Sequence, residues 1–590
     1  MRRKTTSLLL IGLLFLISCV NLQPASAVSR GEMAEVIIKT LDLPRWTGQD
    51  RFSDVPTDHP FFSAIETARA YGIIFPGEKF HPDLEATRIE ALHFAFKAMG
   101  WSHEAEIAQF LAPQENEDIP PFMLPSLSLG ALCSPLAPQP FINFPRQNLE
   151  REDLAELANW LYSCRRSMIW DQTFYGEHTS LRIHREKVGT PPISWAIFIT
   201  ETPDATAAQK IEAELSQKGL SAFIINSETT YTVYTGPYSN FVKAWEIFET
   251  LPTELGAKIV PHSQQKSEAL FWAALQTEGI QKTPTIITAP SLGQPLLPLK
   301  HMTDKTRAEA AINGGFFSSR KPIGTLIVRG IPLSPSYAQR SAMGWTEEGA
   351  TFWGNGEFRA LLRDEYRIAP ITDLNSVPPE NGLGLFSSIA GQFFKPLPLD
   401  SVLYLFGNDS ISEAGSLIRS QRAVPDNSLL LAARGIGIDM IKSFISEGKT
   451  ISMEIEWRDP SMDGSYYALQ GGPMLLKDGQ LQTRNEGFSQ KLREEKHPRT
   501  IVGTDGQKVW WIVIDGRNPW HSGGATLLEA ARLANDLGLS TVLNLDGGGS
   551  SELVWKGQII NAIPGGRERP LPYGIFFAPS TTGGEGSPVS

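Results

Sequence analysis

The clearest pattern of apolar and polar positions lies near the end of the chain. The apolar run WWIVI predicts a strand, and Asp515 follows it directly. Residues 526–539 place apolar side chains three and four positions apart, which predicts a helix with one buried face. Residues 540–546 then predict a second strand that ends at Asp546. A strand, a helix and a strand within about 35 residues predict a crossover between parallel strands, so both aspartates are expected at one edge of a sheet.

Three consecutive glycines and two serines follow Asp546. Because glycine has no Cβ, Gly548 and Gly549 allow backbone N–H groups and the hydroxyl of Ser550 to approach an anion closely. The loop leads into no obvious helix and has no P-loop lysine, which argues against nucleotide binding. A tight structural turn is the alternative explanation for the glycines.

Similar combinations of polar groups and glycine occur elsewhere in residues 265–580. Asn313 precedes Gly314 in the apolar segment AAINGGFF, and Gly472 lies in a third glycine turn. Arg499 is the candidate for gripping a phosphate or carboxylate with two parallel hydrogen bonds. The segment HSGGAT lies just before the predicted helix, whose N-terminus favours anions. A glycine-rich site lined by Asn, Asp and Arg, without Cys or His clusters, indicates sugar and phosphate chemistry rather than redox or zinc chemistry.

The C-terminal region contains, in this order, the segments INGGFF, GGP, PRT, DGR, GGATLLEAA, NLDGGGSS and a late arginine in NAIPGGRERP. This succession resembles the phosphodiester glycosidase family, in which such segments occur in the same order. The resemblance covers residues 265–580, and the family includes the uncovering enzyme, which removes N-acetylglucosamine from a mannose 6-phosphate diester. It implies hydrolysis of a sugar-1-phosphodiester at C1, with Asp546, Asp515 and Arg499 as catalytic residues. The implied substrate contacts are Asn313, Gly314, Gly472, Arg517, His521, Thr526, Asn544, Gly548, Gly549, Ser550 and Arg569.

The chemistry of this reaction suits these residue types. The leaving phosphate is already a weak base, so an arginine that stabilises it could replace a general acid. The anomeric carbon still needs a carboxylate, and we expect Asp546 to act either as nucleophile or as base for water. Asp515 would position water, a metal ion or the sugar. The two aspartates could instead hold Ca²⁺ or Mg²⁺, and no other cofactor is expected.

The N-terminus has the pattern of an export signal, residues 1–27. Basic residues precede an apolar run, and the motif ASA at its end provides a small-residue cleavage site. The segment LISC also resembles a lipobox, in which Cys19 would carry lipid. Both interpretations place the protein outside the cytoplasm. There the remaining cysteines, Cys133 and Cys164, could form a disulfide or stay as buried free thiols.

Residues 28–165 contain an internal repeat. The segments SRGE, TRIE and ERED each open a helical pattern, at a spacing of about 60 residues. The arrangement resembles S-layer homology repeats, whose TRxE motif binds anionic cell-wall polysaccharide, and it predicts an all-α region. The third segment departs from the motif. The resemblance implies wall-binding residues Arg30, Arg88, Glu90 and Arg151, and the alternative for each arginine is a helix-capping salt bridge.

Residues 166–190 are polar and show no clear period, which predicts a linker. Strand and helix patterns then alternate as β-α-β-β-α-β over residues 191–262. This pattern resembles the SPOR domain, a small split βαβ module that binds peptidoglycan glycan strands. Tyr231, Tyr234 and Tyr238 could stack on sugars, although aromatic residues in strands are more often packing.

The net charge of -11 and the sequence pI of about 5.5 argue against nucleic acid as the main partner. No segment beyond the signal is long and apolar enough to span a bilayer. We therefore expect an exported cell-envelope glycosidase that hydrolyses sugar-1-phosphodiester linkages and is tethered to cell-wall polysaccharide and peptidoglycan by its S-layer homology and SPOR-like modules. The expected fold is multidomain, with all-α repeats, a small α+β module, an α/β domain with a mixed sheet, and a disordered tail at 581–590. The alternative is a non-catalytic envelope protein that binds wall glycan or a phosphate-bearing polymer.

Overall fold

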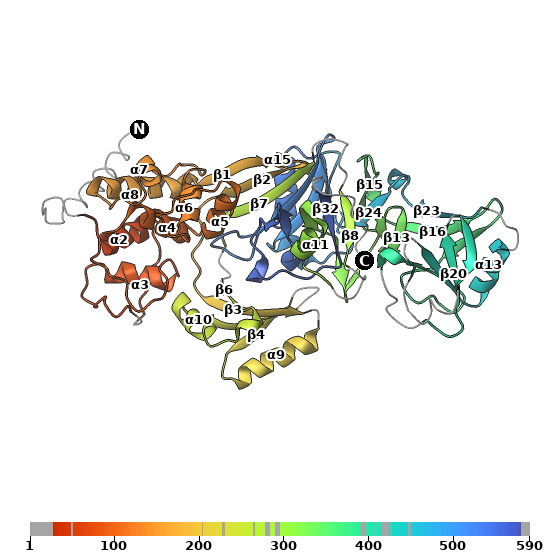
Figure 1. The fold of residues 1–590 in the computed structure, drawn as a ribbon, viewed down its shortest axis with the longest axis horizontal. Coiled ribbons are helices and arrows are strands. Elements are labelled where there is room, and N and C mark those ends of the chain that lie inside the picture. Colours follow the sequence, from red (N-terminus) through yellow and green to blue (C-terminus); the bar gives the residue numbers. More distant parts are fainter. Residues whose placement is uncertain are drawn as a thin grey trace. The chain divides into compact units, whose positions relative to one another are not determined.

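The computed structural model describes residues 27–48, 51–202, 204–226, 231–262, 266–277, 284–289, 296–390, 397–407, 409–414, 424–425, 428–445 and 450–579. The expected export signal with Cys19 and the expected tail at 581–590 lie outside the described residues. The chain divides into two compact units, Met1–Ser167 and Met168–Ser590 (Figure 1). No helix within the described ranges has the length and hydrophobicity needed to cross a bilayer.

The first unit is built from helices. Ser29 caps the first of them by accepting a hydrogen bond from Glu32 N, and Thr87 forms a capping box with Glu90. Cys133 and Cys164 are buried and are not joined in a disulfide, and burial raises the pKa of Cys133 to about 12. The helices are α2 (Arg30–Thr40), α3 (Phe62–Ala70), α4 (Arg88–Met99), α5 (Ser102–Leu111), α6 (Leu124–Gly130), α7 (Gln139–Asn143) and α8 (Arg151–Ser167).

The second unit contains an eight-stranded sheet in the order β1-β2-β7-β28-β27-β29-β25-β26. Every pair of neighbours in this sheet is antiparallel. Helix α15 (Leu527–Asp536) buries the predicted apolar face, including Ala530 and Ala534, against strand residues such as Ile501 and Ile512. The strands are β1 (Ile169–Tyr175), β2 (Thr179–Glu186), β7 (Leu270–Thr277), β25 (Met474–Lys477), β26 (Gln480–Leu481), β27 (Arg499–Thr504), β28 (Val509–Ile514) and β29 (Thr541–Asn544).

This sheet differs from the mixed sheet that the sequence predicts. Strands β28 and β29 do run parallel to each other, because both pair antiparallel with β27, which lies between them. Strand β27 precedes both in the chain, and hydrophobic periodicity carries no information about which strand inserts between two others. The ends of β28 and β29 therefore lie at the same edge, as expected, although the two strands do not pair.

Residues 166–190 are not the linker that their polar composition predicts. They include β1 and β2, which pair from Ile169↔Glu186 to Tyr175↔Ser180. Buried Trp170 is followed by exposed Asp171, but polar residues fill most outward positions and hide the two-residue period. The C-terminal fold thus begins near the start of the second unit, well before residue 265.

The SPOR-like module is inserted between β2 and β7, which are neighbours paired from Thr179↔Thr277 to Glu186↔Leu270. Its sheet has the order β4-β5-β3-β6, and its elements follow the predicted order β-α-β-β-α-β. Trp195 at the start of its first strand pairs with Pro261 at the end of its last, so the two ends of the module lie side by side. Its elements are β3 (Trp195–Thr202), α9 (Ala205–Gln217), β4 (Ala222–Asn226), β5 (Tyr231–Tyr238), α10 (Phe241–Phe248) and β6 (Lys258–Pro261).

A second sheet of this unit, in the order β31-β30-β9-β32-β8, carries the segment NGGFF at the end of β9. Helix α11 (Leu299–Thr306) packs Leu299 and Met302 against Val554 and Phe576 of this sheet. The strands are β8 (Thr285–Thr288), β9 (Ala308–Asn313), β30 (Leu553–Trp555), β31 (Gln558–Ile559) and β32 (Tyr573–Pro579). A third sheet, β13-β12-β24-β14-β15, consists of β12 (Leu326–Val328), β13 (Ile331–Ser334), β14 (Ser341–Trp345), β15 (Thr351–Asn355) and β24 (Tyr467–Gln470).

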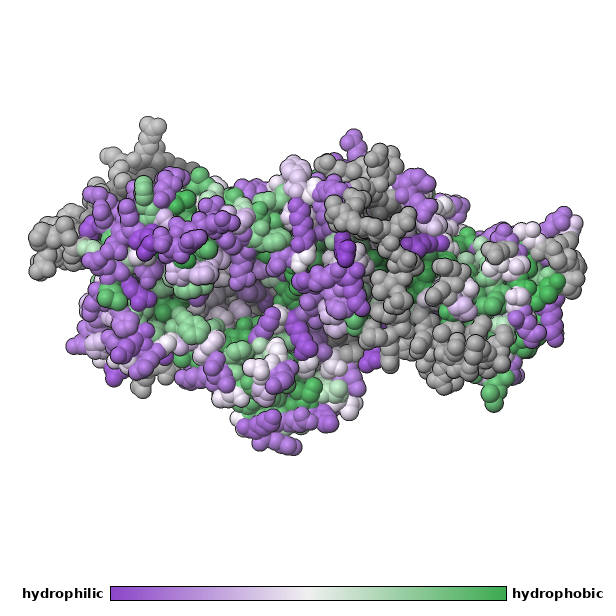
Figure 2. Space-filling model, in the orientation of Figure 1, coloured by the Kyte–Doolittle hydropathy of each residue, from purple (hydrophilic) through white to green (hydrophobic). Residues whose placement is uncertain are grey.

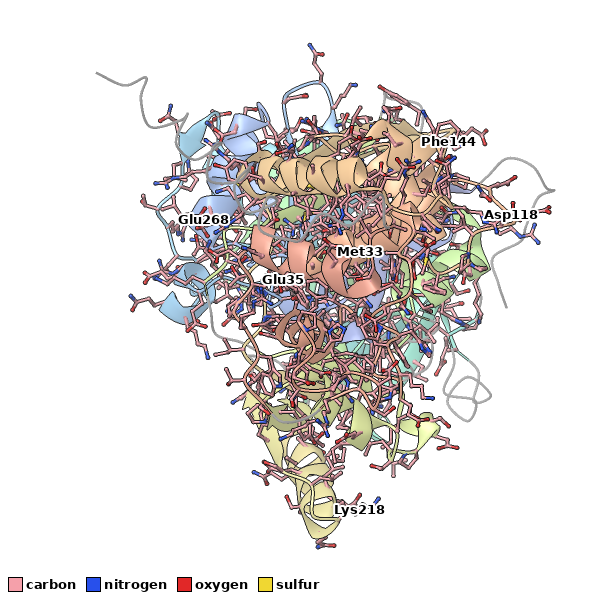
Figure 3. The ribbon with its side chains drawn as sticks, turned by 90° about the vertical axis from the view of Figure 1, so that its left-hand side faces the viewer. Met33, Glu35, Asp118, Phe144, Lys218 and Glu268 are labelled. Carbon is pink, nitrogen blue, oxygen red and sulfur yellow. The ribbon has the colours of Figure 1, made fainter. Side chains whose placement is uncertain are left out.

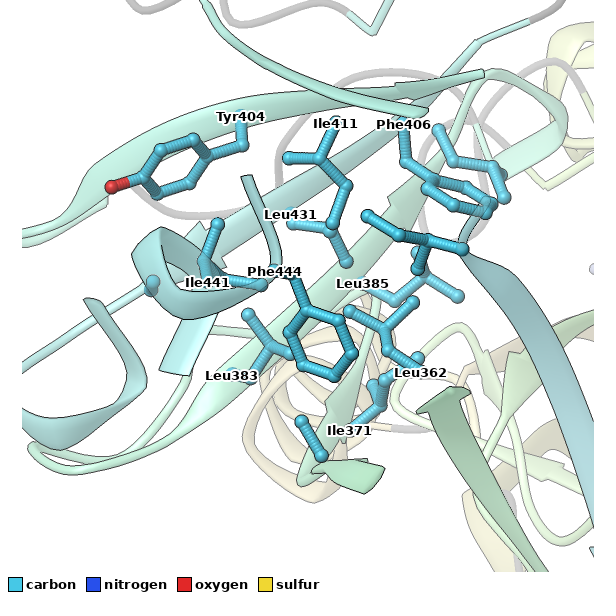
Figure 4. Packing of buried hydrophobic residues seen from close by; sticks show 14 of the residues in the cluster. Leu362, Ile371, Leu383, Leu385, Tyr404, Phe406, Ile411, Leu431, Ile441 and Phe444 are labelled. Carbon is cyan, nitrogen blue, oxygen red and sulfur yellow. The ribbon is translucent and has the colours of Figure 1, made fainter. Parts of the chain in front are cut away.

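The described residues between 358 and 457 form a region with a hydrophobic core of its own. Leu362, Leu385, Leu431 and Phe444 meet in this core (Figure 4). It contains the parallel pair β18 and β19, beside antiparallel pairs. The elements are β16 (Phe358–Arg363), β17 (Ile368–Ile371), β18 (Asp373–Leu374), β19 (Leu383–Ser387), β20 (Val402–Gly407), β21 (Ser410–Glu413), β22 (Leu429–Ala433), α13 (Ile436–Ile445) and β23 (Ser452–Trp457). Short elements elsewhere are β10 (Phe317–Ser318), β11 (Lys321–Pro322) and α14 (Gln490–Glu494).

Candidate active site

Asp546 lies just beyond the end of β29 and is almost fully buried. Its carboxylate accepts hydrogen bonds from the Ser550 hydroxyl and from Gly547 N. Burial raises the pKa of this carboxyl to about 6, while the charge of Arg569 and these two hydrogen bonds oppose the shift. A buried carboxyl group whose pKa lies near neutral pH can act as a nucleophile or as a base.

The triple glycine gives two guanidinium groups room beside Asp546. A Cβ on Gly548, whose φ is 61°, would lie 3.0 Å from Arg517 Nη2. A Cβ on Gly549 would lie only 2.4 Å from Arg569 Nη2. The N–H of Gly548 donates to Pro498 O at 2.9 Å, so this amide is used within the fold instead of facing an anion. The loop therefore brings two cationic side chains to the aspartate.

Arg569 and Arg517 form the positive part of the site. Arg569 Nη1 donates to Ser550 Oγ at 2.9 Å, and only 8% of the Arg569 side chain is exposed. Arg517 keeps accessible surface, while desolvation by the surrounding residues and the charge of Arg569 lower its pKa. Two guanidinium groups close together need anions nearby, and a buried carboxylate alone balances one of them.

Asn313 fastens the Asp546 loop to the second sheet. Its Nδ2 donates to Asp546 O at 2.8 Å, and its Oδ1 accepts from Thr500 Oγ1 at 2.8 Å and from Glu552 N at 3.2 Å. Thr500 Oγ1 also lies 3.2 Å from Ser551 Oγ. Both ends of the amide are thus engaged inside the protein, so Asn313 positions the loop.

Asp515 anchors the loop that carries Arg569. It is 1% exposed and accepts from His521 Nε2 at 2.8 Å, Asn561 Nδ2 at 3.0 Å and Ala562 N at 2.7 Å. Asn561 Nδ2 also donates to Ser551 O at 3.0 Å, so the two strand-end aspartates belong to one hydrogen-bond network. Both Asp515 oxygens are occupied by donors. Within the described ranges no three His, Cys, Asp or Glu side chains are placed to hold a metal ion, and this donor set does not fit Ca²⁺ or Mg²⁺.

The Arg499 guanidinium donates hydrogen bonds to three backbone carbonyls. Nε donates to Ala525 O at 2.8 Å, and Nη2 donates to Leu492 O at 2.6 Å and to Glu495 O at 2.8 Å. These contacts join the end of α14 to the turn before α15. Thr526 is the N-cap of α15 and forms a capping box with Glu529. The structure thus gives both residues contacts within the local fold.

The other glycine turns also accommodate side chains. A Cβ on Gly314 would lie 2.3 Å from the ring of Tyr573, whose hydroxyl accepts from Gly315 N at 2.8 Å. Burial raises the pKa of Tyr573, and the charge of Asp546 adds to the shift. Gly472 has a φ of 122°, and Asn544 Nδ2 donates to its carbonyl at 2.8 Å. Tyr573 thus contacts the glycine turn of the site, although no sequence motif predicts this contact.

The SPOR-like module adds two residues to the surroundings of the arginines. Glu201 at the end of β3 pairs with Arg569. Burial raises the pKa of Tyr234 to about 12, against the opposing charge of Arg517. Tyr234 packs on Phe198 and Phe223, with ring centroids 5.8 and 5.4 Å away. These ring contacts agree with packing, the more common role of strand aromatics, for Tyr234. No pattern in the sequence predicts the contact of Glu201 with the glycine loop, because it joins two separate parts of the fold.

The candidate wall-binding residues of the first unit have partners within that unit. Arg88 is 8% exposed, and its Nε donates to Asp153 at 3.0 Å. Arg30 Nε lies 3.4 Å from Glu90, and its guanidinium stacks on the Phe80 ring at 4.6 Å. Arg151 pairs with Glu32. These ion pairs join different repeats instead of capping the helix of the same repeat, and a wall-binding role of the arginines stays a prediction.

Comparison with known proteins places three families along the chain. Family models match for the S-layer homology domain at residues 51–92, the SPOR domain at 194–261 and phosphodiester glycosidase at 419–578. Among curated proteins, no relative matches. The last of these ranges includes Asp515, Asp546 and Arg569.

Comparison with solved structures matches proteins from three organisms. A protein described as exported, from Burkholderia pseudomallei, is 15% identical with a TM-score of 0.45, covering 70% of this chain and 97% of its own. A hypothetical protein from Synechocystis is 16% identical with a TM-score of 0.42, covering 70% and 76%. The catalytic domain of zebrafish N-acetylglucosamine-1-phosphodiester alpha-N-acetylglucosaminidase, auto-inhibited by its pro-peptide, is 13% identical with a TM-score of 0.30, covering 52% and 77%. Three regions of the chain thus match the models of the S-layer homology, SPOR and phosphodiester glycosidase families, in that order.

Proposed function

We propose that the second unit hydrolyses the bond between an anomeric carbon and a phosphodiester in a phosphate-bearing glycan. The observation that carries this proposal is the meeting of a buried carboxylate, Asp546, with two guanidinium groups at one glycine loop. The family match supplies the reaction class. The substrate class follows from the charges, since a phosphodiester is a monoanion that two arginines can hold.

Arg517 and Arg569 take the place that Arg499 held in the sequence-based expectation. A guanidinium that faces the leaving group can hydrogen-bond its phosphate oxygens and stabilise the charge that develops there. Arg499 and Asp515 become positioning residues in this proposal, because backbone carbonyls and loop donors occupy their polar atoms.

Asp546 acts on the anomeric carbon, as nucleophile or as base for the attacking water. The bond from C1 to oxygen breaks, its electron pair leaves with the phosphate, and water supplies a hydroxyl to C1 and one proton to solvent. With a pKa of about 6, Asp546 is mostly ionised at neutral pH, as either role requires. Arg569 and Ser550 hold the carboxylate in place.

The two accessory families support a location in the cell envelope. The S-layer homology region would bind cell-wall polysaccharide, and the SPOR-like module would bind peptidoglycan glycan strands. In this arrangement the glycosidase acts on polymers close to its anchor.

The test is an assay of the full chain on a synthetic sugar-1-phosphate methyl diester, with release of reducing sugar as the readout. A neutral aryl glycoside of the same sugar is the reference substrate. Turnover of the diester that depends on Asp546 supports the proposal. Binding of the diester without turnover, measured by calorimetry on the same preparation, would instead favour the non-catalytic envelope protein.

A further inference from the structure

The position of the SPOR-like module relative to the glycine loop is fixed by contacts on several sides. The module leaves the eight-stranded sheet after β2 and returns at β7. Thr190 N donates to Pro519 O at 2.9 Å, and the Trp195 and Trp520 rings meet edge to face at 6.1 Å. Pro519 and Trp520 belong to the segment that follows Arg517. The module therefore rests on the loop that carries one of the two site arginines.

The same module also packs against the segment that precedes Arg569. A Cβ on Gly565 would lie 2.7 Å from the Phe198 ring, and one on Gly566 would lie 2.4 Å from the Lys258 side chain. Both glycines have a positive φ, which suits glycine, and a Cβ on Gly565 would overlap the Phe198 ring. Both arginine-bearing segments thus contact the inserted module.

Glu201 lies where these contacts converge. It is held by the pairing of β3 with β5, in which it lies opposite Thr232. Its carboxylate forms an ion pair with Arg569 Nη2, and 16% of its side chain is exposed. Its Oε2 would be 2.9 Å from a Cβ on Gly549, so the carboxylate lies directly above the glycine loop. The charge of Glu201 also acts on Asp546 and on Arg517.

The four charged side chains that lie at the glycine loop balance when Glu201 is counted. Arg517 and Arg569 contribute two positive charges, and Asp546 and Glu201 contribute two negative ones. A phosphodiester that entered beside both carboxylates would leave an excess negative charge in a largely desolvated place, which is unfavourable. The substrate anion and the Glu201 carboxylate therefore exclude each other.

We propose that Glu201 of the glycan-binding module occupies the phosphate position on Arg569 and competes with the substrate's phosphate for it. The inference rests on the proposed function of the same site. Substrate binding then requires the Glu201 carboxylate to leave Arg569, and anything that draws the module away from the loop, such as a bound glycan strand, favours substrate binding. The module that recognises the wall thereby sets the affinity of the site for phosphate.

The test compares Glu201→Gln with wild type, using Glu214→Gln as the matched control. Glu214 lies on α9, whose sequence continues to Lys218 at the outer tip of the module (Figure 3). Figure 2 shows hydrophilic residues along the outer side of α9, as expected for a helix that buries only Ala208 and Leu215. Both substitutions remove one carboxylate from the same module, but only one of them lies at the site.

We expect Glu201→Gln to lower KM for the sugar-1-phosphate diester about tenfold and to leave kcat equal or higher. Glu201→Asp, which keeps the charge with a shorter reach, should lie between wild type and Glu201→Gln. Glu214→Gln should match wild type. A fall in kcat at constant KM would overturn the proposal and make Glu201 a catalytic residue. An unchanged KM and kcat would also overturn it.

Calorimetric titration with inorganic phosphate separates this inference from the proposed reaction. We expect Glu201→Gln to bind phosphate about tenfold more tightly than wild type, and this result requires no turnover. Tighter phosphate binding by Glu201→Gln, in a protein that hydrolyses no diester, would contradict the proposed function. It would still support competition between Glu201 and phosphate for Arg569. Diester hydrolysis with equal phosphate affinity in both proteins would leave the function intact and remove the competition. Thermal midpoints of all variants check that the module stays folded.

Discussion

Asp546 and Arg569 share the hydroxyl of Ser550. Arg569 Nη1 donates to Ser550 Oγ at 2.9 Å, and the hydroxyl donates in turn to the Asp546 carboxylate. The hydroxyl thus bridges the Arg569 guanidinium and the Asp546 carboxylate and orients both groups. Burial raises the pKa of the Asp546 carboxyl, and the charge of Arg569 and the hydrogen bond from Ser550 oppose this shift, so the group stays mostly ionised at neutral pH.

Asp546→Asn should abolish turnover while the protein stays folded. Loss of the carboxylate is expected to lower kcat by about a thousandfold or more. The folded-state pKa of about 6 lies above the usual 3.8, so this group favours folding fully below pH 3.8, and that contribution is lost as the pH rises toward 6. The loss amounts to about 3 kcal/mol for the two-unit shift. Urea unfolding between pH 4 and 7 should therefore show a smaller decline for Asp546→Asn than for wild type, and a rate near wild type would remove Asp546 from the mechanism.

The pair Gly549→Ala and Gly538→Ala tests whether the triple glycine serves the site. A Cβ on Gly549 meets Arg569, whereas Gly538, with a φ of 85°, has open space around the added atom. Gly538→Ala should cost about 1 kcal/mol of stability and leave phosphate affinity unchanged. Gly549→Ala should weaken phosphate binding through displacement of Arg569. Equal phosphate affinity in the two variants would favour an ordinary tight turn.

Two arginine substitutions separate phosphate binding from loop anchoring. Arg569→Lys keeps the charge but loses the fork geometry, so kcat/KM for the diester should fall by about tenfold or more. The loss for a neutral aryl glycoside should be smaller, since that substrate depends on Arg569 only through the orientation of Asp546. Arg499→Lys removes donors from backbone carbonyls and should lower the thermal midpoint instead. A selective loss on phosphodiesters in Arg499→Lys would return the phosphate role to that residue.

Two N-terminal truncations locate the N-terminal boundary of the fold that carries the candidate site. Removal of residues 1–167 should keep diester hydrolysis and abolish co-sedimentation with cell-wall material that depends on the S-layer homology region. Removal of residues 1–190 also deletes β1 and β2 from the eight-stranded sheet and should give insoluble or unfolded protein. A soluble and active 191–590 fragment would show that these strands are dispensable.

Glu552→Gln should stabilise the protein at alkaline pH without altering activity. Burial raises the pKa of Glu552 well above its usual value, and the neighbouring Glu568 carboxyl adds to the shift. A carboxyl with a raised folded-state pKa favours folding at low pH, and this contribution is lost as the pH rises above 4.5. The glutamine keeps a donor toward Glu568 without the charge. The thermal midpoint at pH 8 should exceed that of wild type while the two agree at pH 4, and a lower midpoint at pH 8 would contradict this account.

The sequence predicts the site residues that lie at the ends of strands. It does not predict the site residues that are brought there by contacts between distant parts of the chain. The apolar runs before Asp515 and Asp546 place both aspartates at one edge, and they belong to one hydrogen-bond network. Asp515 nevertheless differs from Asp546, because its carboxylate accepts hydrogen bonds from Asn561 and Ala562. These donors come from a loop whose sequence shows no hydrophobic period. Periodicity reports the buried face of a segment and says nothing about which distant loop supplies its partners.

The contact of Glu201 with Arg569 joins residues far apart in the chain, and no local pattern encodes it. The polar strands β1 and β2 were missed because their outward positions carry charged and polar residues, so composition hid the alternation. Hence the order of the families could be predicted from the chain, but the nesting of one inside the other could not.

The adjacency of Trp195 and Pro261 at the two ends of the inserted module has a consequence for how the chain folds. Pairing Glu186 with Leu270 in an unfolded chain would close a loop of about 80 residues. Once the module has folded, its ends already lie side by side, and only about 16 residues of that loop lie outside the module. The entropy cost of closure falls by about 1.4 kcal/mol as a result. The folded SPOR-like module would thus favour the pairing of β2 with β7, so a substitution that destabilises the module should also slow formation of the eight-stranded sheet.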